Sequence, residues 1–148
     1  MVWKPNVTVA AIVERDGSFL MVEEETAQGL RFNQPAGHLE PGESLVDAVV
    51  RETLEETRYH FRPQALVGIY SWRNPDSATT YLRFAFAGEI VGFDPQRDLD
   101  VGIVAAHWID ADRILAETAR HRSPMVATCL GDFLAGRRTA LDVLVSVV

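Results

Sequence analysis

The amino-acid sequence predicts an α+β domain in which a mixed β-sheet lies between helices. The chain has 148 residues, close to the size of a common single domain, and no stretch of it reads as a long linker, so we take residues 1–148 as one domain. Apolar residues make up 47% and charged residues 24%, which is typical of a protein that buries a core. Strand and helix patterns alternate without a strict βαβ order, which favours a mixed sheet.

The N-terminal third predicts strands joined by one tight turn. Residues 7–13 and 18–23 are rich in β-branched and apolar side chains, and the Asp-Gly pair between them is typical of a hairpin. Residues 23–31 are polar and contain a glycine, so we expect a loop there. The stretch 33–39 contains a proline, which indicates an edge strand or an irregular strand.

A helix is predicted for residues 43–57. A Pro-Gly pair precedes it, and Ser44 is available to cap its first turn. The pattern places an apolar stripe on one side of this helix, so we expect it to pack against the sheet.

The second half predicts three further strands and two helices. The strands cover 65–72, 79–90 and 105–109, and an Asn-Pro-Asp-Ser turn separates the first two. Asp110 is expected to cap a helix that lasts to about residue 119. The last helix fits 124–134, with Pro124 in its first turn and Gly136 at its end.

Net charge narrows the range of partners. A formal charge of −7 repels a polyphosphate backbone, so we expect no nucleic-acid duplex as a partner. A small anionic metabolite remains possible if a metal ion supplies local positive charge. Cys129 is the single cysteine and fits a reducing compartment. No secretory pattern or bilayer-length apolar run is visible. We therefore expect a cytoplasmic protein that binds no membrane, as a monomer or a weak homodimer.

Three carboxylates share one edge of the helix at 43–57. At about 100° per residue, Glu52 and Glu56 fall within about 20° of Leu45 on the apolar stripe, and Glu55 lies about 80° to one side. The acids therefore do not face solvent as a group. Like charges at this spacing destabilise a helix by roughly 0.2–0.5 kcal/mol per pair, and partial burial adds to the cost.

A divalent cation explains this arrangement better than an acidic surface does. Arg51 can support one of the three glutamates but not all of them, whereas hard oxygen ligands at short spacing suit Mg²⁺, with Mn²⁺ as a substitute. A solvated acidic helix edge held by Arg51 is the alternative, because exposure is the usual state of a glutamate.

The full spacing of polar residues around this helix resembles the signature of the Nudix hydrolases. The matching positions are Gly37, Glu43, Arg51, Glu52, Glu55 and Glu56. The resemblance implies an α/β/α sandwich and hydrolysis of a phosphoanhydride bond. It also implies metal binding by the three helix glutamates with a backbone carbonyl of Ala36 or Gly37. Arg51 would orient the glutamates, and Glu43 would favour the helix dipole.

Two positions depart from that signature. Thr53 replaces an apolar residue but resembles valine closely in shape, so it suits the edge of a core. Arg58 replaces the glycine that ends the helix. Because an arginine with positive φ is uncommon, we expect the helix to end differently here.

The resemblance extends over most of the chain. Residues 22–26, 33–40 and 122–126 look like a phosphatase branch of the family. That branch releases phosphate from nucleoside tri- and diphosphates and from the pyrophosphate of the thiamine pyrimidine precursor (HMP-PP). The alternatives are a pyrophosphatase for ADP-ribose or another nucleoside-diphosphate derivative, to which Pro75 points, and a Nudix module that binds a nucleotide without cleaving it. All the metal-binding acids of the signature are present, which favours an enzyme.

Substrate contacts are expected from Glu24, His38 and Trp72. His38 follows the signature glycine and could touch a phosphate, although a lone loop histidine is more often structural. Trp72 could stack on a base, together with the strand aromatics Tyr70 and Phe84, although such residues usually pack into a core. The general base stays open among Asp98, Asp100, Glu55 and Glu56.

Overall fold

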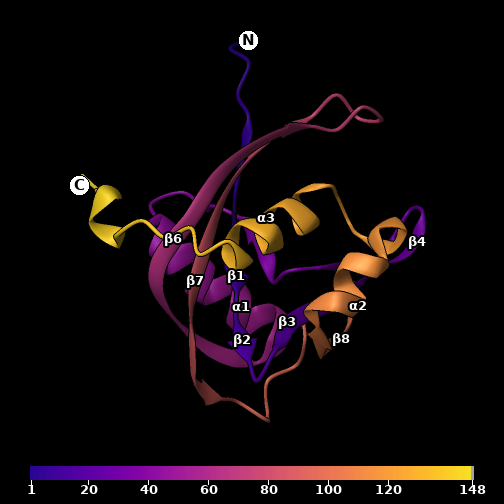
Figure 1. Ribbon diagram of the computed structural model, residues 1–148. Coiled ribbons are helices and arrows are strands. Elements are labelled where there is room, and N and C mark those ends of the chain that lie inside the picture. Colours follow the sequence, from indigo (N-terminus) through magenta and orange to yellow (C-terminus); the bar gives the residue numbers. More distant parts are fainter. Residues whose placement is uncertain (148) are drawn as a thin grey trace.

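The computed structural model describes residues 1–147 and contains two β-sheets with helices packed around them (Figure 1). The first sheet has the strand order β5-β1-β7-β6. Its strands are β1 (Asn6–Ile12), β5 (Ala36–His38), β6 (Tyr59–Arg73) and β7 (Thr80–Phe93). β1 pairs with β7 in parallel and with β5 antiparallel, so the predicted mixed sheet is confirmed.

The second sheet is built on β3. It comprises β2 (Glu14–Arg15), β3 (Ser18–Thr26), β4 (Gly29–Asn33) and β8 (Ile103–Asp110). The loop expected at 23–31 is wrong, because β3 continues to Thr26 and turns directly into β4. The polar side chains that indicated a loop are used in ion pairs. Glu23, for example, accepts a hydrogen bond from Arg120 at 3.3 Å.

Helix α1 (Leu45–Thr57) forms where the apolar stripe predicted it. The Ser44 side chain caps its first turn by accepting from the backbone N–H of Asp47 at 3.1 Å. Thr53 and Thr57 are both buried, and their hydroxyls donate to the carbonyls of residues one turn earlier. This pairing explains why a threonine is tolerated where the family signature has an apolar residue.

The C-terminal half contains shorter helical segments. These are α2 (Ala111–Ala116), η1 (Thr118–Arg120), α3 (Met125–Leu134) and η2 (Leu141–Val143). The helix expected to reach residue 119 ends at Ala116. Asp110 does not cap it through its side chain, because that carboxylate accepts from the Ser18 hydroxyl at 2.6 Å. Across the described residues, no helix is long and apolar enough to span a bilayer.

The two faces of the first sheet are covered by different helices, which confirms the α/β/α sandwich (Figure 1). On one face, Ala48 and Val49 of α1 pack against Val9 of β1 and Phe86 of β7. The opposite face packs against α3 through Met125, Val126, Cys129 and Leu130. Alternate residues of β1 therefore point to different helices, and Thr8 lies on the α3 side.

The end of α1 differs from the expectation at Arg58. This residue has φ 67° and ψ 5°, so it adopts the left-handed conformation that a glycine would adopt, and its N–H donates to the Leu54 carbonyl at 2.9 Å. The expected alternative ending is therefore wrong. The carbonyl of Arg58 accepts from Asp94, and its guanidinium lies 6.0 Å from the centre of the Phe93 ring. These contacts hold a conformation that Arg58 alone would disfavour.

We predict that Arg58→Gly stabilises the protein modestly, by about 0.5 kcal/mol, which a urea denaturation midpoint would measure. Relief of left-handed strain gains about 1–2 kcal/mol, and the greater freedom of glycine in the unfolded chain offsets part of this gain. Arg58→Ala is the matched control, because it removes the contact with Phe93 but keeps the strain, and it should give no gain. A lower midpoint for Arg58→Gly would contradict the strain argument.

Candidate active site

A cavity of about 360 Å³ lies where β5, α1 and the outer ends of β6 and β7 meet. Its lining combines an acidic end with an aromatic end. The acidic end includes Glu24, Glu40, Glu52 and Glu56, and the aromatic end is formed by Trp72 and Tyr81. An elongated ligand that is charged at one end and carries a ring at the other would match this distribution.

Gly37 and Glu52 fit together at the acidic end. Gly37 lies in the edge strand β5, and a Cβ atom at this position would overlap the carboxyl group of Glu52. Any side chain at residue 37 would therefore displace that carboxylate. The glycine of the signature is required here by the close approach of Glu52 rather than by a positive φ.

Glu56 is, with Glu52, one of the two buried acids among the described lining residues of the cavity. Its side chain accepts a hydrogen bond from the backbone N–H of Ala36 at 2.9 Å, and the residue is 9% exposed. Burial raises the pKa of Glu56 to about 9, and the nearby charges of Glu24 and Glu52 act in the same direction. Glu56 thus needs a positive partner to be ionised near neutral pH.

Arg51 connects the other acids. Its guanidinium donates to Glu43 through Nε and Nη2, to Glu52 at 2.9 Å and to Glu55 at 3.1 Å through Nη1. It also donates to the carbonyl of His38 at 3.0 Å. Arg51 therefore supports two of the three helix glutamates, one more than the sequence indicated. Glu56 has no cationic contact in the described part of the chain.

Glu52, which lines the cavity, belongs to a cluster of acids that fits a divalent cation. Carboxylate oxygens of Glu52, Glu55 and Asp100 lie within 4.8 Å of one another. Burial raises the pKa of Glu52 to about 7 although Arg51 opposes this, and burial also raises the pKa of Glu55. Hard oxygen donors gathered this closely, with excess negative charge, suit Mg²⁺ or Mn²⁺.

The three residues expected to contact substrate all line this cavity. Glu24 reaches it from β3, His38 from β5 and Trp72 from the outer end of β6. Trp72 stacks against Tyr81 with ring centres 5.9 Å apart and planes inclined by 19°. The other two aromatic residues considered for stacking, Tyr70 and Phe84, do not line this cavity. Phe84 packs on the α1 side, and the hydroxyl of Tyr70 donates to Asp132.

Several residues of the site were not expected as such. Asp100 appeared in the sequence only as one of several candidate bases, yet its carboxylate belongs to the acidic cluster, and its N–H donates to the carbonyl of Glu55 at 3.1 Å. Tyr81, Arg83 and Thr8 also line the cavity. Nothing in their local sequence indicated this, because strand pairing between distant segments brings them there.

Comparisons with known proteins agree with this geometry. A family model described as the NUDIX domain matches residues 3–129. Phosphatase NudJ of Escherichia coli strain K12 is 40% identical over 142 residues, which cover 96% of this chain and 92% of that protein. A solved NUDIX hydrolase from Nitrosomonas europaea is 52% identical with a TM-score of 0.94, over 97% of this chain and 98% of that one.

A more distant solved structure shares the fold alone. It is an ADP-ribose pyrophosphatase from Streptococcus suis, 20% identical with a TM-score of 0.65, which covers 90% of this chain and 93% of its own.

We predict that the metal-free protein loses stability as pH rises between about 5.5 and 8.5. The folded-state pKa values of Glu52 and Glu56 are raised from 4.5 to about 7 and about 9. The unfolded chain therefore releases these protons at lower pH than the folded chain does, and the stabilisation is lost as pH passes through the folded values. Calorimetric Tm values in EDTA would measure this slope.

Glu56→Gln should flatten the slope, because the amide resembles the protonated carboxyl and can still accept from Ala36. Glu14→Gln, at an exposed position in β2, is the control and should keep the slope of the parent protein. Added Mg²⁺ should reverse the loss, since it binds the ionised acids. A Tm in EDTA that rises with pH would exclude this account.

Proposed function

Because this chain belongs to the Nudix family and is therefore a phosphohydrolase, we propose that it removes terminal phosphate groups from small phosphorylated metabolites in a reaction that depends on Mg²⁺. The proposed substrates are nucleoside tri- and diphosphates and the thiamine pyrimidine precursor pyrophosphate. The observation that carries the proposal is the cavity itself, in which clustered carboxylates lie at one end and the stacked pair Trp72 and Tyr81 at the other. Similarity to phosphatase NudJ over nearly the whole chain supports it.

The acidic end would hold the cation. Glu52, Glu55 and Glu56, with the backbone carbonyl of Gly37, are the proposed ligands. The carboxylate of Asp100 lies within 4.8 Å of those of Glu52 and Glu55. A bound divalent cation would neutralise phosphate charge and lower the pKa of an attacking water. Mn²⁺ should substitute, because it accepts the same oxygen donors.

The protein's own groups would orient and bind the reactants. Arg51 would keep the carboxylates of Glu52 and Glu55 in place through its hydrogen bonds to both. Trp72 and His38 would contact the substrate, and Glu24 would face it from β3. Asp100 is better placed than Asp98 to act as the general base, because its carboxylate belongs to the acidic cluster.

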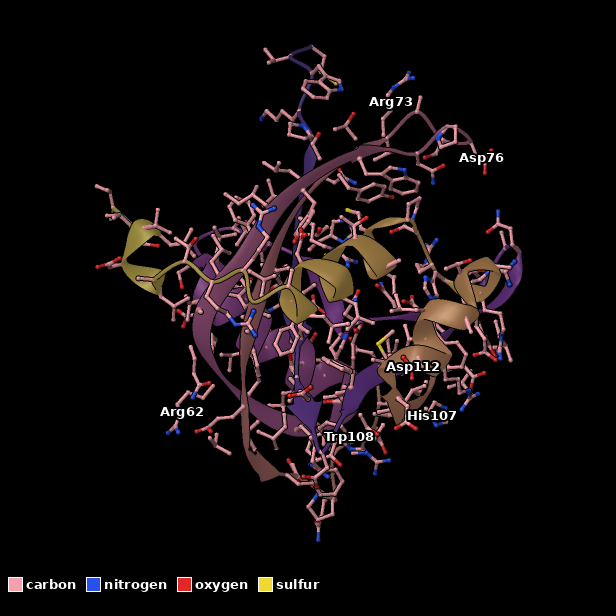
Figure 2. The ribbon with its side chains drawn as sticks, in the orientation of Figure 1. Arg62, Arg73, Asp76, His107, Trp108 and Asp112 are labelled. Carbon is pink, nitrogen blue, oxygen red and sulfur yellow. The ribbon has the colours of Figure 1, made fainter. Side chains whose placement is uncertain are left out.

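Cleavage of ADP-ribose is the second candidate. Pro75 lies in the exposed hairpin between β6 and β7, which projects beyond the sheet and carries Arg73 and Asp76 near its tip (Figure 2). A wider hollow of about 970 Å³ beside this hairpin shares Trp72, Asn74 and Arg122 with the first cavity. That hollow could receive the second half of a dinucleotide-like substrate. The two candidate functions differ in their products, because only the first releases inorganic phosphate.

We predict that Glu56→Gln lowers kcat by at least about two orders of magnitude, because it removes one charge from the proposed metal site. The fold should persist, since the Gln oxygen can accept from Ala36 N–H. Colorimetric phosphate release with Mg²⁺ or EDTA measures the effect, and circular dichroism checks the fold. Glu14→Gln should retain activity. An unchanged rate in Glu56→Gln would overturn the assignment of this residue.

Inorganic phosphate should be a direct product, with a nucleoside di- or monophosphate as its partner. ADP-ribose should be a poor substrate, because both sides of its pyrophosphate carry bulky groups. Phosphorus NMR of a substrate panel would identify the products. If ADP-ribose or a dinucleoside polyphosphate is cleaved with a higher kcat/KM than every terminal phosphate donor, the second candidate is correct.

A further inference from the structure

Arg83 is a buried cation in the wall of the cavity, only 3% exposed. Its Nη1 donates to the side-chain oxygen of Gln34 and its Nη2 to that of Asn33, each at 3.0 Å. Both of these partners are neutral amides, and Nη1 also lies 3.9 Å from the sulfur of the Cys129 thiol, which is a weak acceptor. Among the described residues, no carboxylate lies within ion-pairing distance of this guanidinium, and its Nε has no hydrogen-bond partner. The positive charge of Arg83 is therefore not neutralised by the protein.

Thr8 lies beside Arg83. The two residues are partners in the parallel pairing of β1 with β7, so their side chains share the sheet face that α3 covers. Thr8 is 7% exposed and also lines the cavity. Its hydroxyl likewise has no partner within residues 1–147. Two neighbouring buried donors are thus both left unsatisfied, and buried polar groups are rarely unpaired without a reason.

The charges around the cavity indicate which kind of ligand group the Arg83 and Thr8 donors would bind. Arg83 and Arg122 are the two cationic side chains among its described lining residues. Arg122 is exposed and lies 3.8 Å from Glu24, whereas Arg83 has no acidic partner within residues 1–147. A buried guanidinium strongly favours an anionic oxygen over a neutral ring atom. The matching ligand group is therefore an anion, and in the proposed substrates this anion is a phosphate.

Position identifies which phosphate this would be. Tyr81 lies two residues before Arg83 in β7, so both side chains point to the same sheet face. Thr8 also pairs with His38 of β5, the strand that contains Gly37 at the acidic end. Arg83 and Thr8 thus lie between the aromatic pair and the proposed metal site.

We propose that Arg83 and Thr8 form a phosphate-binding floor for the phosphate group that the product retains. This inference rests on the proposed function, since it assumes that the cavity receives a phosphorylated substrate. The Thr8 hydroxyl donates a hydrogen bond to an oxygen of this phosphate, and the Arg83 guanidinium supplies the positive charge opposite it. The alternative is a purely structural Arg83 that ties the segment before β5 to β7.

Thr8→Val separates these readings, because it removes the hydroxyl and preserves the shape. Within the described residues the Thr8 hydroxyl has no hydrogen-bond partner, so the variant should keep or raise the Tm. It should nevertheless weaken binding of inorganic pyrophosphate in EDTA by about tenfold, the loss expected for one hydrogen bond to a charged group. Thr8→Ser, which keeps a hydroxyl, should bind within about twofold of the parent protein. Isothermal titration calorimetry gives both constants.

Nitrogen-15 NMR of the unmodified protein adds a readout that needs no variant of Arg83. Pyrophosphate in EDTA should shift the Arg83 Nε–H signal, whereas adenosine, which has no phosphate, should leave it in place. An unmoved signal, or full affinity in Thr8→Val, would overturn the proposal. An equal shift with adenosine would also overturn it, because the floor would then contact the base. Since neither measurement involves turnover, a wrong substrate in the activity assays would leave this test intact.

Discussion

The contact between Gly37 and Glu52 is the constraint on which the site depends. Glu52 can occupy the space beside β5 because residue 37 has no side chain. The Arg51 guanidinium donates a hydrogen bond to this Glu52 carboxylate. It also donates to Glu55 and to the carbonyl of His38. Helix α1 and strand β5 are thus joined through charged groups rather than apolar packing. Their relative position determines where any cation and any phosphate would lie.

The charged groups of the site interact unfavourably with their buried surroundings, and a bound ligand could stabilise them. Arg51 lowers the pKa of Glu43, yet burial raises the pKa of Glu52 and Glu56 to about 7 and about 9. The Arg83 cation in the cavity wall has, within residues 1–147, only neutral partners, namely the amides of Asn33 and Gln34 and the Cys129 thiol. The cavity thus combines acids that favour a cation with a guanidinium that favours an anion and has no acidic partner among the described residues. Both groups of charges would be stabilised by a metal ion together with a phosphorylated ligand.

Local sequence was sufficient for features that depend on helical periodicity. The apolar stripe of α1 placed Glu52 and Glu56 against the core, and both are buried. The Ser44 cap and the mixed sheet followed from similarly local signals. The sequence misled where tertiary contacts compensate a local disadvantage. Arg58 adopts a left-handed conformation because its backbone holds Asp94, and the polar end of β3 is a strand because Glu23 pairs with Arg120.

The rest of the site could not be predicted because it depends on pairings between distant segments. Thr8 and Arg83 become neighbours through the parallel register of β1 with β7, and Asp100 joins the acids through a hydrogen bond to the end of α1. Neither position carries a motif. A local pattern therefore identifies the helix that would hold a metal, because its ligands are close in sequence. The walls that would select the substrate are assembled from separate strands, so relatives that share the helix can differ in what they hydrolyse.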